Sequence, residues 1–229
     1  MSKFARFTSL ALGLVAALTV AGCNDDDSNP TAPPAQAHVM VVHASPDAPG
    51  VDLIVDGAVA GTNLTFPNNT PYLAVSAGTH NVKVNVAGTS TTVINANPSL
   101  SAGTDYSVFA CDSVATITPL VLTDDLTTPA AGKAHVRFIH LSPNAPAVDV
   151  AVQAGPVLFP NESFKDYSAF TPVDAGTYDL EVRLAGTTTV VLPLPGITLS
   201  AGKIYTVFAK GFVGGTGAQA LGAQIIVNN

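Results

Sequence analysis

The sequence contains no tryptophan, and charged residues make up only 11% of its 229 positions. The lack of tryptophan weighs against a carbohydrate site built on exposed aromatic platforms. Acidic residues outnumber basic ones, and the formal net charge is −7. Nucleic acids and anionic lipid surfaces attract basic proteins, so neither is expected as a partner. The sequence is rich instead in Val, Thr, Ala, Gly, Pro and Asn, a composition typical of all-β proteins with many turns.

The N-terminus has the organisation of an export signal. Lys3 and Arg6 precede an apolar stretch, residues 7–20, which is too short to span a bilayer comfortably. The stretch ends in Val-Ala-Gly-Cys, which resembles the lipobox of bacterial lipoproteins. The resemblance implies a signal peptide over residues 1–22 and a lipidated Cys23 that carries acyl chains such as palmitate. The alternative is an ordinary signal peptide with a cysteine near the cleavage site by chance.

Lipidation predicts an exported protein anchored at the bacterial cell envelope through its N-terminus. Asn24, in place of Asp after the lipidated Cys23, favours the outer membrane over the inner one. Residues 23–36 then form a tether, because Asp25 to Asp27 are acidic and residues 31–35 are proline-rich. Residues 24–36 of this tether span up to about 40 Å, at roughly 3.3 Å per residue.

Cysteine is almost absent from the rest of the chain. If Cys23 carries lipid, Cys111 has no partner for an intramolecular disulfide. Cys111 follows Phe109 within an apolar segment, so we expect a structural thiol; the alternative is a nucleophile.

One loop occurs twice, 97 residues apart, and we call its two copies the marker loops. The shared residues are His43, Ser45, Pro46, Pro49 and Asp52 in the first copy, and His140, Ser142, Pro143, Pro146 and Asp149 in the second. Further segments repeat at nearly the same offset, which indicates a tandem duplication. We therefore predict a first module over residues 37–126, a linker over residues 127–133 and a second module over residues 134–229.

Each module is predicted to be an antiparallel β-sandwich of about seven strands, of the immunoglobulin-like or fibronectin-like kind. Alternating segments such as residues 51–55 and 81–86 indicate half-buried strands, and Gly and Pro separate them. The segment Leu-Ser-Ala-Gly before Tyr106 and Tyr205 resembles a tyrosine corner, in which the tyrosine hydroxyl bonds to an upstream backbone group. The short linker suggests that the modules stack end to end.

The two units that begin His-Val and continue His-x-Ser-Pro-x-Ala-Pro-x-Val-Asp resemble domain of unknown function 4397, a family of bacterial envelope proteins. The resemblance covers nearly all of the mature chain and implies two copies of a secreted, β-rich module. It implies no activity.

The marker loops admit three interpretations. His43, Ser45 and Asp52 have the residue types of a hydrolase triad, but the sequence lacks a Gly-x-Ser-x-Gly elbow and each serine precedes a proline. Calcium at Asp47, Asp52 and Asp56 is the second interpretation, weakened by Asn144, Asp149 and Gln153 in the second copy. We favour the third, a rigid architectural connection in which the aspartates bind loop amides or the histidine.

These features favour a non-enzymatic envelope protein that needs no cofactor and acts as a spacer, adhesion or protein-interaction element. A surface protein is the expected partner. The alternative is a module that binds a glycan or another extracellular ligand, and a hydrolase comes third. Phe159, Phe164 and Tyr167 lie in a segment without a good match in the first module, so they are the candidates for a ligand loop. The competing interpretation is that they cover the open end of the module.

Overall fold

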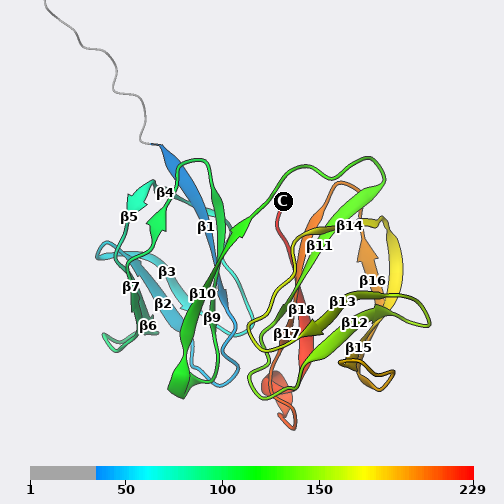
Figure 1. Cartoon of the computed structure of the whole chain (residues 1–229). Helices are drawn as coiled ribbons and strands as arrows, with labels where there is room; N and C mark the ends of the chain where they lie inside the picture. Colours follow the sequence, from blue (N-terminus) through cyan, green and yellow to red (C-terminus); the bar gives the residue numbers. More distant parts are fainter. Residues whose placement is uncertain (1–34) are drawn as a thin grey trace, which may run out of the picture. The chain divides into compact units, whose positions relative to one another are not determined.

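The computed structural model describes residues 35–229 (Figure 1). The predicted signal peptide, Cys23 and nearly all of the predicted tether lie outside this range. The described residues form one compact unit with its own hydrophobic cores. Within the described range, no helix is long and apolar enough to cross a membrane.

The fold is an all-β sandwich, as predicted. In the first module one sheet has the order β10 (Thr118–Asp124), β9 (Asp105–Cys111), β1 (Gln36–His43), β4 (Leu73–Ser76). The facing sheet has the order β3 (Ala58–Leu64), β2 (Val51–Val55), β6 (Val82–Val86), β7 (Thr92–Ala96). A two-stranded ladder of β5 (Gly78–Thr79) and β8 (Ser99–Leu100) lies beside them, and η1 (Val114–Thr116) precedes β10.

The second module repeats this order. Its first sheet runs β14 (Thr171–Asp174), β11 (Lys133–His140), β17 (Ile204–Lys210), β18 (Gly222–Val227), with η2 (Gly217–Gln219) before β18. Its second sheet runs β13 (Val157–Glu162), β12 (Val148–Val152), β15 (Gly176–Leu184), β16 (Val190–Leu199). In the first sheet of the second module, β18 pairs with β17 as β10 pairs with β9 in the first module. β14 likewise pairs with β11 as β4 pairs with β1.

One strand pair in each module departs from the expected antiparallel arrangement. β1 pairs in parallel with β9, and β11 pairs in parallel with β17. Parallel neighbours need a long connection, and here the connection contains the whole facing sheet. Two four-stranded sheets of this order also differ from the four-plus-three strand order of constant-type immunoglobulin domains.

The predicted tyrosine corner is present in both modules. The hydroxyl of Tyr106 accepts a hydrogen bond from the Ser101 amide at 3.1 Å, and that of Tyr205 accepts one from the Ser200 amide at 3.0 Å. Each bond ties a central strand to the turn that precedes it. These bonds hold the start of β9 and of β17 in the same way.

The modules pack sheet against sheet, so the expectation of end-to-end stacking is wrong. Met40 and Val42 of β1 join Phe109 in one apolar cluster with Ile139 and Phe208 of the second module. The rings of Phe109 and Phe208 meet edge to face, with centroids 6.0 Å apart. β1 is buried on both faces, which explains its unbroken apolar run Val-Met-Val-Val.

A buried polar network crosses the same interface. The Arg137 guanidinium, which is 2% exposed, lies 2.6 Å from a carboxylate oxygen of Asp124. The other oxygen of Asp124 accepts hydrogen bonds from the hydroxyls of Tyr72 and Ser107. Arg137 also donates to Thr206 at 2.8 Å. Buried charges are tolerated when paired and hydrogen-bonded in this manner.

Candidate functional site: an apolar cavity in the first module

The marker loops are held by their histidines. Nε2 of His43 lies 3.0 Å from the Pro49 carbonyl, and Nε2 of His140 lies 3.1 Å from the Pro146 carbonyl. A carbonyl only accepts, so Nε2 carries the proton in both rings. Burial lowers the pKa of both histidines, and the rings are therefore neutral donors.

The aspartates of the loops bind backbone amides. Asp149 accepts hydrogen bonds from the amides of Asn161 at 2.7 Å and Gly186 at 2.9 Å. Asp52 accepts the equivalent bonds from Asn63 at 2.8 Å and Gly88 at 2.9 Å. Each carboxylate thus links β2 or β12 to the neighbouring strand, β3 or β13, and to the turn that contains Gly88 or Gly186.

The structure does not assemble the hydrolase triads. In the described range no hydrogen bond joins His43 to Ser45 or Asp52. Ser142, the equivalent of Ser45, donates to the Gly211 carbonyl at 2.7 Å. Among the prolines of the loops, Pro49 and Pro146 supply the carbonyls that the histidines bind, and Pro46 and Pro143 directly follow Ser45 and Ser142. The Ser45 hydroxyl is buried without a hydrogen-bond partner, whereas the histidines, Ser142 and the aspartates bind backbone groups, as expected of an architectural connection.

The carboxylates proposed for calcium also diverge. Asp47 accepts a hydrogen bond from the Val114 amide at 2.8 Å, and Asp56 pairs with His80. Among the described residues no group of three or more His, Cys, Asp or Glu side chains gathers as a metal site.

The predicted ligand loop is wrong in one part. Phe159 lies on β13, not in a loop, and it stacks on Phe138 in the core with ring centroids 6.2 Å apart. Tyr167 is 54% exposed. Phe164 packs under the ammonium of Lys165, which lies 5.0 Å from the ring centroid. Phe159 and Tyr167 therefore occupy different environments and do not share one surface.

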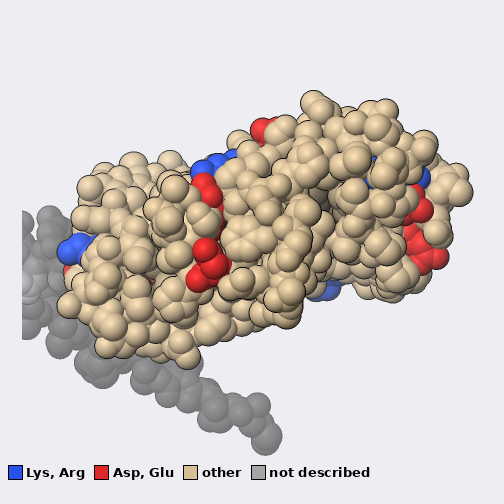
Figure 2. Space-filling view, turned by 90° about the horizontal axis from the view of Figure 1, so that it is seen from below, with Lys and Arg blue, Asp and Glu red and all other residues tan. Residues whose placement is uncertain are grey.

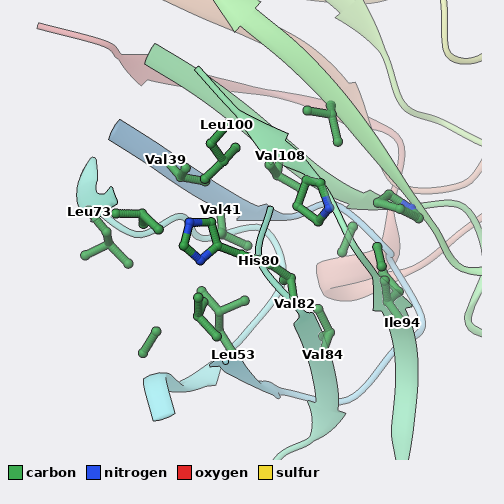
Figure 3. A pocket seen from close by; sticks show the side chains of 18 of the residues that line it. Val39, Val41, Leu53, Leu73, His80, Val82, Val84, Ile94, Leu100 and Val108 are labelled. Carbon is green, nitrogen blue, oxygen red and sulfur yellow. The ribbon is translucent and has the colours of Figure 1, made fainter. Parts of the chain in front are cut away.

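A cavity of ≈ 390 Å³ lies between the two sheets of the first module (Figure 3). Val39 and Val41 of β1 line one side, and Leu53 and Val84 of the facing sheet line the other. All lining residues except His80 are Val, Leu, Ile, Ala or Pro. The cavity falls within the usual size range of ligand pockets, roughly 300–1,000 Å³.

His80 forms part of the wall with both ring nitrogens engaged. Nδ1 lies 2.6 Å from the Asp56 carboxylate, and Nε2 lies 2.6 Å from the Ser76 carbonyl. These acceptors, Asp56 first, raise the pKa of His80 by stabilising the protonated ring. The ring therefore has no free donor to offer to the interior.

A second hollow of ≈ 300 Å³ lies beside the marker loop of the second module. Its walls include His140, Pro146 and Val213. It lies at the end of the sandwich beside the loop, whereas the larger cavity occupies the space between the sheets.

Residues 37–151 match the sequence model of a family described as "Domain of unknown function (DUF4397)". The chain belongs to this family. No curated protein matches the chain. The DUF4397 match covers the first module and continues through β11 and nearly all of β12 of the second.

In the second module, side chains fill the space between the sheets that corresponds to the cavity of the first module. There the space between the sheets is ≈ 20 Å³. The strand pairing aligns Gly61 with Phe159, because they lie opposite the equivalent residues Leu53 and Val150. It also aligns Ala96 with Leu194.

Two further positions follow the same trend. Val41 and Phe138 lie two residues before the marker histidines, and His80 and Tyr178 lie two residues before the equivalent residues Val82 and Leu180. At all four aligned positions the first module carries the smaller residue. The two modules thus share a fold, but the core of the first contains a cavity that the core of the second lacks, and sequence reasoning missed this difference. The detectable signal was glycine in place of phenylalanine within a repeat.

Proposed function

We propose that this DUF4397 protein is a non-enzymatic component of the bacterial cell envelope that holds a small apolar molecule in its first module. Lipid at Cys23 anchors it, at the outer membrane if the cell has one. In this proposal the second module is a further copy of the same unit with a closed core.

One observation carries the proposal: the ≈ 390 Å³ cavity against the ≈ 20 Å³ left in the equivalent place. Protein interiors are normally packed to the density of organic crystals, and voids larger than a water molecule are few. An apolar cavity of about 150 Å³ already binds benzene. An unfilled space of this size is costly without a ligand, because its lining loses both dispersion contacts and burial.

Titration with an uncharged apolar fluorophore such as N-phenyl-1-naphthylamine tests the proposal. The protein is the soluble segment 24–229, which contains every described residue. We expect saturable binding with one site per chain. Gly61→Phe, which copies the second module, should abolish it, and Val59→Phe should not, because Val59 is 65% exposed on the same strand. Binding that survives Gly61→Phe would place the probe in the second hollow and contradict the proposal.

A role as spacer, adhesion or protein-interaction element is the second candidate. It is supported by the buried Arg137–Asp124 pair and the shared apolar cluster, which join the modules into one unit. Proximity labelling on intact cells would identify a protein partner. A glycan array would test carbohydrate binding, for which Tyr167 offers one exposed aromatic ring.

A further inference from the structure

The chemistry of the cavity restricts its ligand. The one polar side chain in its lining is His80, and both of its ring nitrogens are bonded to oxygens of Asp56 and Ser76. A polar group of a ligand that enters the cavity would therefore lose its hydrogen bonds to water and find no hydrogen-bond partner in the lining. That exchange costs several kcal/mol for a neutral group and far more for an ionised one. The buried part of the ligand must be hydrocarbon.

The charge of the protein surface around the cavity restricts the headgroup of the ligand, the part that remains outside the cavity. Between residues 37 and 126 Lys83 is the single lysine, arginine is absent, and there are seven aspartates. Arg137 and Lys165 of the second module pair with Asp124 and Asp112, which leaves Asp47, Asp52, Asp56, Asp105 and Asp125. Val82 and Val84 line the cavity, so Lys83 between them points to the opposite face of β6. Figure 2 shows how sparse Lys and Arg are on one face of the molecule.

The positive charge of a protonated His80 does not change this balance. The Asp56 carboxylate neutralises it at 2.6 Å, and Asp56 also accepts the Asn81 amide at 2.8 Å. An anionic headgroup would therefore compete with an existing partner and approach a surface of the same sign. The local field opposes it at low ionic strength.

We infer that the ligand of the first module is an uncharged molecule with a hydrocarbon chain, and not a fatty-acid anion or another acidic lipid. The inference rests on the proposed function and names the class of ligand for that same cavity. The cavity has about two and a half times the volume of one that holds benzene, so a chain of medium length is a suitable probe.

Three ligands with the same ten-carbon chain separate the possibilities: 1-decanol, decanoate and decylammonium. Each is titrated against the bound fluorophore at pH 8, at low and at high salt, below its aggregation concentration. We expect 1-decanol to displace the probe at a concentration at least tenfold lower than decanoate does. Added salt should narrow that gap, because it screens the repulsion of the carboxylate.

Other outcomes overturn the inference in distinguishable ways. Decanoate binding as tightly as 1-decanol would show that the site accepts an anionic headgroup. Decylammonium binding more tightly than 1-decanol would make the ligand cationic. A bound fluorophore that none of the three displaces would exclude a hydrocarbon chain and leave the proposed function intact. A fluorophore that does not bind at all would refute the proposed function itself.

Cavity-filling variants link the result to the site. Ala96→Leu and Gly61→Phe should each weaken 1-decanol at least tenfold, and Val59→Phe should leave it unchanged. Ala96→Leu adds only three carbons, so this variant provides the test if the Gly61→Phe protein does not fold. Unchanged 1-decanol binding in a folded Ala96→Leu or Gly61→Phe protein would place the ligand elsewhere and overturn the inference.

Discussion

The guanidinium of Arg137 in the second module lies 2.6 Å from the carboxylate of Asp124 in the first, and both side chains are buried. Tyr72 and Ser107 bind the same carboxylate, so the charges are paired and hydrogen-bonded. The pair lies beside the apolar cluster that both modules share. This one contact therefore reports whether the modules remain joined.

Removing one partner should destabilise the protein strongly. Arg137→Met leaves the buried Asp124 carboxylate without a counter-charge, and we expect a loss of about 3–5 kcal/mol in the free energy of unfolding. Urea denaturation followed by circular dichroism measures it. The double variant Arg137→Met with Asp124→Leu should recover much of the loss, because no isolated charge remains. A double variant less stable than Arg137→Met alone would contradict this account.

The marker aspartates should contribute through backbone amides. Asp149→Ala leaves the amides of Asn161 and Gly186 without their acceptor, and we expect a loss of about 1–3 kcal/mol in the free energy of unfolding. Asp149→Asn keeps one acceptor oxygen and should lose less. Asp52→Ala should act in the same direction. An unchanged melting temperature in both alanine variants would reject the architectural role.

Acid should destabilise the protein through the marker histidines. Their pKa values are lowered from 6.5 in the folded state, because burial favours the neutral rings. Their contribution is complete above the unfolded pKa and is lost as the pH falls from about 6.5 through the folded values. The pKa of His80 is raised, so its contribution is complete below 6.5 and is lost only as the pH rises.

The measurement is the free energy of unfolding at pH 7.5 and at pH 5. We expect a decrease at pH 5 in the native protein and a smaller one in the variant His43→Gln with His140→Gln, which keeps a donor but does not titrate. An equal decrease in the free energy of unfolding of both proteins would show that titratable groups other than His43 and His140 cause the acid destabilisation.

Cys111 should react slowly in the folded protein. It is fully buried, and burial raises the pKa of its thiol to about 11. At pH 8 the reactive thiolate is therefore scarce and inaccessible. Ellman's reagent applied to segment 24–229, which lacks Cys23, should react rapidly only after denaturant is added. Rapid labelling under native conditions would show that β9 opens readily.

At the aligned core positions Ala96 and Leu194, we expect a larger side chain to stabilise the first module and a smaller one to destabilise the second. Ala96→Leu should stabilise the ligand-free protein by about 0.5–2 kcal/mol, because it fills empty space. The reverse change, Leu194→Ala, should cost about 2–5 kcal/mol, because it opens a void in a filled core. Thermal unfolding at two scan rates measures both. A destabilising Ala96→Leu would mean that the first core is already full.

Local sequence patterns predicted the elements of the fold well. Period-two alternation located strands such as β6, and the repeated Leu-Ser-Ala-Gly segment located the tyrosine corners. The parallel pairing of β1 with β9 was missed, because it depends on which strands meet after the chain has crossed to the facing sheet and back. Alternation within a strand carries no information about its partner.

The interface and the cavity were missed for a related reason. The face of β1 that holds Met40 and Val42 is apolar, but the partner on that face is set by tertiary packing. Phe159 was assigned to a loop because Gly61 takes its place in the first module and breaks the repeat. That break marks where the cores of the two modules differ in volume.

The sheet β10-β9-β1-β4 has two occupied faces. Val39 and Val41 of β1 line the cavity, and Met40 and Val42, which alternate with them, contact the second module. On β4 Leu73 lines the cavity, while the neighbouring Tyr72 donates to Asp124. A molecule that enters the cavity is thus separated from the second module by a single layer of backbone. A ligand in the cavity and the second module therefore contact opposite faces of the same strand, β1.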